Sequence, residues 1–147
     1  MEEKEYNQLA DRLKEKPPII KHCLNAFLYG GIIGVIGEAI LEFYQNVFNI
    51  SEKQAGVIMI ITMVLIASLL TGMGIYDRIA SKAGAGTFIP ITGFANSMTS
   101  SALESKSEGL VTGIGANMFK LGGTVITFGI VSSFILGGIR YVIASFW

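Results

Sequence analysis

Long runs without a charged residue constrain this chain of 147 residues more than any other feature. The runs Gln54 to Tyr76 and Leu121 to Ile139 each match the roughly 20 apolar residues that cross a hydrocarbon core of about 30 Å. A third run, His22 to Gly37, reaches that length if Glu38 is taken inside it. Charged residues make up 15% of the sequence, against about 25% in soluble domains. The sequence therefore predicts an all-α, multi-pass membrane protein.

The remaining composition excludes several classes of function. The formal net charge is zero, with the charged residues gathered at the N-terminus and in short loops, so no nucleic-acid surface is predicted. The single histidine, His22, is adjacent to the single cysteine, Cys23, which predicts neither an internal disulfide nor a metal site. The sequence lacks a nucleophile paired with a base and a phosphate-binding loop. We therefore expect no enzymatic activity, no metal and no cofactor.

The N-terminal segment differs from the rest of the chain. Tyr6, Leu9 and Leu13 recur at helical spacing among charged residues, and Pro17 and Pro18 follow. Residues 1–16 are therefore predicted to form an amphipathic helix within a cytoplasmic tail, 1–21, that precedes a single transmembrane domain, 22–147. Three interpretations of this segment stay open: a helix that lies along the lipid headgroups, a helix that docks to a soluble partner, or a solvated tail.

Basic residues give the expected orientation in the membrane. The tail is rich in lysine and arginine, and the loop 76–82 contains Arg78 and Lys82, whereas the loop between the first two spans has only Lys53. Because basic residues remain in the cytoplasm, the N-terminus and the loop 76–82 are predicted to share the cytoplasmic side.

The spans are predicted to be of unequal length. We expect about three full transmembrane helices, within 25–44, 55–75 and 124–143, and two half-length or re-entrant helices, 92–103 and 109–119. A straight helix from 109 to 143 would be about 52 Å long, so a break is predicted at Lys120 to Gly123. The glycine-rich first span is expected to pack closely against protein, and the charged residues 104–108 are expected to be in water.

The run Ala83 to Leu103 is uncharged but unlike an ordinary span, because it contains three glycines, a proline, an asparagine and six hydroxyl side chains. Backbone exposed to lipid must be fully hydrogen-bonded, so a broken segment at this depth is expected inside protein or along a water-filled path. Polar side chains at membrane depth are the transport-pathway candidates: Lys120, Glu38, Asn96, Asn117, Ser97, Thr99, Ser100 and Thr92. The candidate hinge or helix-break residues are Pro90, Gly93, Gly113, Gly122 and Gly123.

Each charged candidate has more than one interpretation. Lys120 either extends to a headgroup or provides a positive charge for an anion, next to helix N-termini. Glu38 either pairs with Lys120 or Arg140 or binds a cation, and Arg140 is interpreted mainly as an interface anchor. The hydroxyl and amide groups either replace the water shell of a solute or satisfy each other between helices.

The chain also resembles a known family, the small SpoVA membrane proteins of endospore-forming bacteria, of the SpoVAC and SpoVAE type. The resemblance covers CLNAFLYGGIIGVIGEAI, then LLTGMGIYDRIASKAGAGTFIPITGFANSMTSSALESKSEG, then GLVTGIGANMFKLGGTVITFGI, and the charged tail ending in two prolines is most similar to SpoVAC.

This resemblance implies a multi-pass protein of the inner forespore or spore membrane. It implies a channel subunit that moves dipicolinic acid, with calcium, during sporulation and germination, and a tension-gated activity has been proposed for this type. The implied partners are other SpoVA membrane and soluble subunits, in a homo- or hetero-oligomer, together with membrane lipid. Two alternatives stay open: a platform whose tail recruits soluble SpoVA subunits, and a small coupled transporter that uses Glu38.

Overall fold

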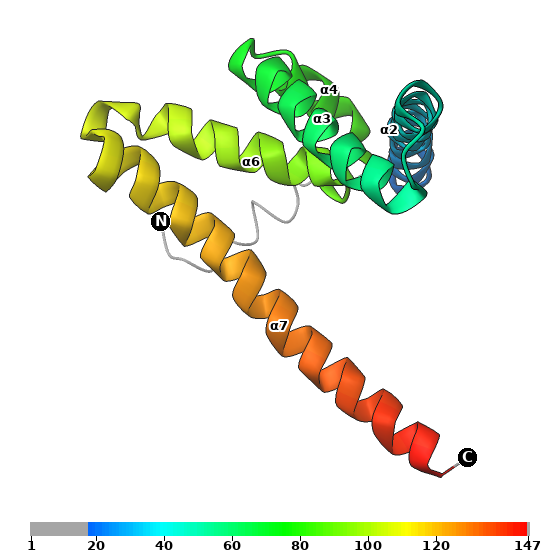
Figure 1. Cartoon of the computed structure of the whole chain (residues 1–147). Helices are drawn as coiled ribbons and strands as arrows, with labels where there is room; N and C mark the ends of the chain where they lie inside the picture. Colours follow the sequence, from blue (N-terminus) through cyan, green and yellow to red (C-terminus); the bar gives the residue numbers. More distant parts are fainter. Residues whose placement is uncertain (1–17, 147) are drawn as a thin grey trace.

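The structure, a computed structural model, describes residues 18–146, in which every regular element is helical (Figure 1). The amphipathic helix predicted for 1–16 lies outside these residues. The elements are α2 (Ile19–Phe48), α3 (Glu52–Gly72), α4 (Tyr76–Ala83), α5 (Ala85–Phe88), α6 (Ile91–Glu104), the 3-10 turn η1 (Lys106–Glu108), the π-helical turn η2 (Leu110–Gly115) and α7 (Ala116–Ser145).

Helices α2 and α3 form a hairpin. Asn49, in the left-handed conformation, ends α2, and Ser51 caps α3 by exchanging hydrogen bonds with Gln54. Within residues 18–146, three helical stretches are long and apolar enough to cross a membrane: α2, α3 and Leu110–Ser145. This confirms the predicted helical membrane fold with three full spans.

The short elements α4 to α6 fold back against this hairpin. Helix α4 is amphipathic, with Tyr76 and Ala83 buried and Arg78 and Lys82 exposed. Gly84, with φ of 53°, provides the sharp turn into α5, which packs on α2. Pro90 precedes α6, the half-length helix predicted for 92–103, and α6 packs on α3.

The C-terminal helix contradicts two expectations. Helix α7 is continuous from Ala116 to Ser145, so the break predicted at Lys120 to Gly123 is wrong, and Gly122 and Gly123 are ordinary helical residues. The segment 109–119 is likewise not a separate half-length helix, because η2 leads directly into α7. Glycines are tolerated here because lipid offers the backbone no alternative hydrogen-bond partner. The irregular turn lies earlier, at η2, which contains Gly113.

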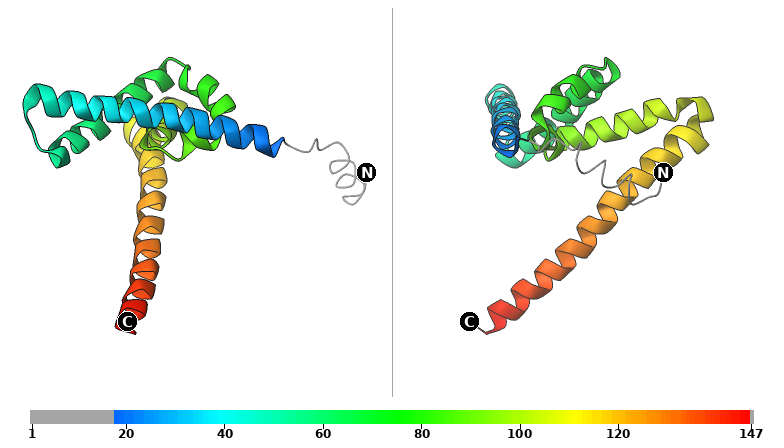
Figure 2. Two further views of the ribbon diagram at one scale, coloured as in Figure 1. Left: turned by 90° about the vertical axis from the view of Figure 1, so that its right-hand side faces the viewer. Right: turned by 180° about the vertical axis from the view of Figure 1, so that it is seen from behind.

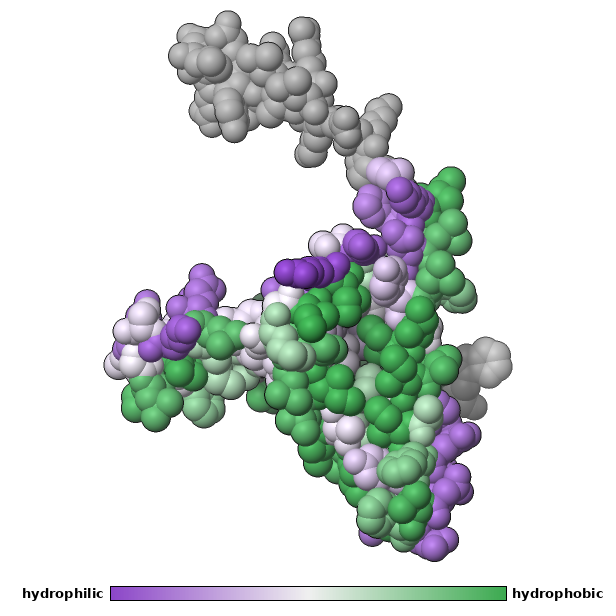
Figure 3. Space-filling view, turned by 90° about the horizontal axis from the view of Figure 1, so that it is seen from above, coloured by the Kyte–Doolittle hydropathy of each residue, from purple (hydrophilic) through white to green (hydrophobic). Residues whose placement is uncertain are grey.

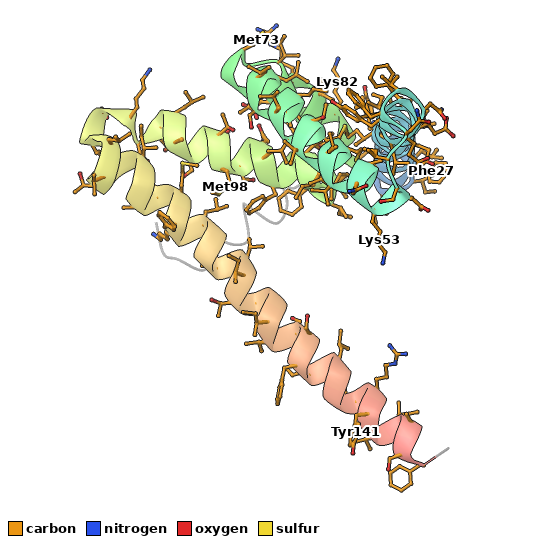
Figure 4. All side chains as sticks on the ribbon, in the orientation of Figure 1. Phe27, Lys53, Met73, Lys82, Met98 and Tyr141 are labelled. Carbon is orange, nitrogen blue, oxygen red and sulfur yellow. The ribbon has the colours of Figure 1, made fainter. Side chains whose placement is uncertain are left out.

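Helix α7 extends from the rest of the molecule as a long arm. In Figures 1 and 2 only its first turns approach other elements, and its direction crosses that of α2. It contacts α6 and η2, and Met98 of α6 lies between the two helices (Figure 4). Asn117 fastens its start, donating to Ser105 Oγ at 2.8 Å and to the Gly113 carbonyl at 3.2 Å.

The contact between α2 and α5 gives a test of this packing. A Cβ added to Gly86 would meet the Ala26 carbonyl oxygen, and the Gly30 nitrogen at 2.9 Å. We expect Gly86→Val to lower the free energy of unfolding by about 1 to 3 kcal/mol, because backbone cannot move aside. The measurement is the thermal midpoint of the purified protein in detergent. Gly56→Val is the control, since a Cβ at Gly56 has no neighbour within 4 Å; equal midpoints for the two variants would contradict this packing.

Candidate transport site

A hollow of about 500 Å³ lies between α4, α5 and the start of α6. Its lining residues are Tyr76, Ala80, Gly84, Ala85, Thr87, Phe88, Gly93, Asn96 and Ser97. This volume is within the range of about 300 to 1,000 Å³ typical of small-molecule sites. Most of the lining comes from the uncharged run that begins at Ala83, so the broken, polar part of the sequence surrounds a cavity.

Tyr76 holds the three walls of this hollow together. The residue is 5% exposed, and its hydroxyl lies 3.0 Å from the Thr87 carbonyl oxygen and 2.9 Å from Thr92 Oγ1. The phenol proton is directed toward both oxygen atoms and is shared between them. Residues from α4, α5 and α6 are thereby fixed to one another.

Asn96 is the polar side chain best placed to meet a solute. The Thr71 hydroxyl, on α3, lies 2.7 Å from Asn96 Oδ1 and 2.8 Å from the Ala67 carbonyl oxygen, and its one proton is shared between these two acceptors. With this oxygen bonded, Asn96 retains amide N–H groups that can donate to a ligand in the hollow. Ser97, on the next position, donates to the Gly93 carbonyl at 3.0 Å. The hollow is therefore uncharged and mainly apolar, with Asn96 and Ser97 among its few polar side chains.

A second hollow, of about 560 Å³, adjoins the first. The two share Phe88, Gly93 and Ser97, and the second continues to Leu121 and Val125 on α7. Cavities therefore lie on both sides of the first turns of α6.

Positive charge lies close to the first hollow. Helix α4 lines the hollow with Tyr76 and Ala80 and exposes Arg78 and Lys82 to the outside. Asn25 of α2 donates to the Lys82 carbonyl at 3.3 Å, which places the start of α2 beside α4. Figure 3 shows hydrophilic surface over this end of the hairpin and again near the α2–α3 turn, with hydrophobic surface between them, and Figure 4 shows Lys82 and Lys53 at separate edges.

The structure brings together part of the predicted pathway set. Asn96 and Ser97 line the first hollow and Thr92 is bonded to its Tyr76, whereas Thr99 and Ser100 lie farther along α6. The other three candidates lie elsewhere: Asn117 at the base of α7, Lys120 exposed on α7, and Glu38 exposed on α2. Glu38 and Lys120 are on helices that do not pack together in this chain.

Sequence reasoning missed Tyr76, Thr87 and Thr71 as parts of the site. Tyr76 begins the segment 76–82, which is interpreted from its basic residues as a cytoplasmic loop. Its role depends on α5 and α6 folding back onto it, and the sequence around Tyr76 does not predict that contact. Its signal was a tyrosine next to a charged turn, directly before the polar uncharged run. Within residues 18–146 every buried side-chain nitrogen or oxygen has a hydrogen-bond partner, so these hydroxyl groups also stabilise the fold.

Comparison with known proteins identifies the family. The family model described as SpoVAC/SpoVAEB sporulation membrane protein matches residues 22–139. The chain belongs to this family. A relative named Stage V sporulation protein AC, from Bacillus subtilis (strain 168), is 52% identical over 136 residues, which cover 92% of this chain and 91% of the relative. No solved structure matches the chain.

The family assignment supports a role in sporulation for this membrane protein. The matched range, 22–139, contains both hollows and most of α7. The resemblance found in the sequence is thus confirmed over nearly the whole chain.

The Tyr76 hydroxyl can be tested alone. We expect Tyr76→Phe to destabilise the protein by about 1 to 3 kcal/mol, because the buried Thr87 carbonyl and Thr92 hydroxyl lose a partner. Thermal unfolding in detergent measures the loss. Tyr141→Phe, on the exposed part of α7, is the matched control and should leave the midpoint unchanged. A Tyr76→Phe midpoint equal to wild type would show that this hydroxyl does not hold the hollow together.

Proposed function

We propose that this protein is a channel subunit for dipicolinic acid, with calcium as the accompanying cation, in the membrane that surrounds the spore core. The proposal combines the family's role in sporulation with one structural observation, the hollow lined by Asn96 beneath the basic helix α4. Loading during sporulation and release during germination are the proposed directions of movement, and membrane tension is the proposed gate.

The hollow suits an aromatic dianion for three reasons. Asn96 offers amide N–H donors that can bind a carboxylate. Phe88, which is 77% exposed, provides aromatic surface that can stack on a ring at offset or edge-to-face geometry. The lining residues carry no fixed charge, so an anion meets no repulsion and is not held too tightly to leave, as conduction requires.

Arg78 and Lys82 support the choice of an anionic solute. Both are exposed on the outer face of α4, whose inner face lines the hollow. Helix α4 also carries the exposed Asp77, so its net charge is +1. A net positive charge beside a low-dielectric cavity raises the local concentration of anions. The adjoining second hollow provides a continuation past α6.

Asn96→Asp tests the hollow directly. The substitution keeps an oxygen for Thr71 and the size of the side chain, but it replaces the amide N–H donors with negative charge. We expect dipicolinate flux through liposomes containing the purified protein to fall about ten-fold or more, because like charges repel strongly in a low-dielectric site. Flux should be measured with and without membrane tension. Asn46→Asp, exposed near the end of α2, is the isosteric control; equal flux in both variants would exclude Asn96 from the path.

Lys120 is a second proposed element of the path, as an attracting charge beside the second hollow. It is exposed on α7, one residue before Leu121, which lines that hollow. We expect Lys120→Glu to abolish dipicolinate accumulation in spores while the protein still reaches the membrane, and Lys120→Arg to retain it. Normal accumulation in the Lys120→Glu strain would remove Lys120 from the path and leave the proposal for Asn96 intact.

A further inference from the structure

A basic edge lies where the start of α2 meets the end of α4. Asn25 of α2 donates to the carbonyl of Lys82, in the last turn of α4, at 3.3 Å. Lys21 precedes Asn25 by one helical turn on the same face of α2, about 6 Å along the helix axis. Arg78 precedes Lys82 by one turn on α4, and all three basic residues are exposed. Three cations thus lie within one helical turn of the contact between α2 and α4.

The charge of this edge is positive. Within residues 18–28 and 76–83, the three basic residues Lys21, Arg78 and Lys82 stand against one acidic residue, Asp77, which gives a formal charge of +2 with His22 neutral. In Figure 3 hydrophilic surface passes from the start of α2 onto the neighbouring part of the hairpin. Helix α4 is amphipathic, with its apolar side against the protein. Its charged side is therefore suited to the level of the lipid headgroups.

An apolar groove of about 320 Å³ begins directly below this edge, between α2 and α5. Its lining includes Ala26, Gly30 and Gly31 of α2, and Ala85, Gly86 and Ile89 on the other side. Ala26 follows Asn25, and Ala85 is three residues after Lys82. The groove therefore continues from the basic edge along α2 toward the middle of that span.

Small residues keep this groove open. Helices α2 and α5 approach closely where Gly86 meets the backbone of Ala26 and Gly30. A Cβ built on Gly31, which also lines the groove, has no neighbour within 4 Å. An apolar chain can therefore lie against α2 here without displacing a side chain.

A basic edge above an apolar groove matches the two ends of one class of molecule, the anionic phospholipids. Basic pockets beside transmembrane helices bind anionic headgroups, and the groove provides apolar surface for an acyl chain. A free phosphate would leave the groove empty, and a zwitterionic lipid would bring its own positive charge to the lysines. We propose that one anionic phospholipid binds here, with its headgroup between Lys21 and Lys82 and an acyl chain between α2 and α5.

A lipid bound in this groove contacts a wall of the first hollow. Ala85 lines both the groove and that hollow, and Tyr76 and Ala80 of α4 line the hollow as well. The lipid therefore stabilises the position of α4 and α5 against α2. The proposal concerns lipid binding and does not depend on which solute moves through the protein.

Lipid titration of the full-length protein in detergent tests the basic edge. Native mass spectrometry counts bound phosphatidylglycerol and gives an apparent dissociation constant for the first molecule. We expect Lys21→Gln combined with Lys82→Gln to raise this constant about ten-fold or more, because two charges that attract the headgroup are lost. Lys53→Gln combined with Lys106→Gln removes the same charge from exposed lysines elsewhere and should leave the constant unchanged.

A second pair of variants tests the groove. Gly31→Leu places a side chain in the groove without a clash, so we expect it to weaken binding by a similar factor. Gly34→Leu is the matched control, because a Cβ at Gly34 is equally open but lies outside the groove lining, and it should bind normally. Helix content and monodispersity identify any variant that fails to fold, and for such a variant Lys82→Gln alone or Gly31→Ala takes its place.

The choice of lipid and of competitor separates this site from general attraction to charge. Phosphatidylcholine should bind about ten-fold more weakly than phosphatidylglycerol, and inorganic phosphate at constant ionic strength should not displace the bound lipid. Equal binding of the two lipids, displacement by phosphate, or unchanged binding in a folded lysine or Gly31 variant would each overturn the proposal. Equal weakening in the variants and their controls would also overturn it, because the attraction would then belong to the whole surface.

Discussion

The hydroxyl of Tyr76 joins the three short elements on which the rest of the structure depends. It meets a backbone carbonyl of α5 and a side chain of α6 from a position at the start of α4. At membrane depth a carbonyl such as that of Thr87 has no water to bond, so leaving it unpaired is costly. The buried phenol therefore provides a partner for one of the carbonyl groups freed where the helix breaks between Ala83 and Ile91.

The interruption of the helix between Ala83 and Ile91 places polar groups around the hollow. Because helices α4 and α5 are short, the turn at Gly84 and the start of α6 bring backbone and hydroxyl groups around one space. Asn96 both forms a hydrogen bond with Thr71 and lines the hollow. The polar side chains that line the hollow are thus the same ones that hold its walls together.

Helix α7 is joined to this unit by a different kind of contact. Asn117 fixes its base, Gly122 faces Met98 of α6, and no residue in its most hydrophobic 18-residue window is buried within the described part of the chain. A helix of this length gains its packing partners from lipid or from other subunits. Among the three candidate spans of the described residues, this helix is the one with no buried residue in its most hydrophobic window.

The sequence by itself determined the class of the protein. Uncharged runs of about 20 residues predicted the three spans, and the polar run after Ala83 predicted the half-length helix α6, because hydropathy and proline act locally. The quoted motifs determined the family in the same way. The prediction of a break at Lys120 to Gly123 failed because glycine breaks helices readily only where water competes for the backbone.

Only the tertiary structure decided which polar residues share a site. Tyr76, Thr87 and Asn96 belong to different elements, and their meeting depends on the close approach of Gly86 to the backbone of α2. The same fold separates Glu38 from Lys120, which lie on helices that do not pack together. Side-chain chemistry can be identified from sequence, but hydrogen bonds between distant residues are set by the packing of the backbone that carries them.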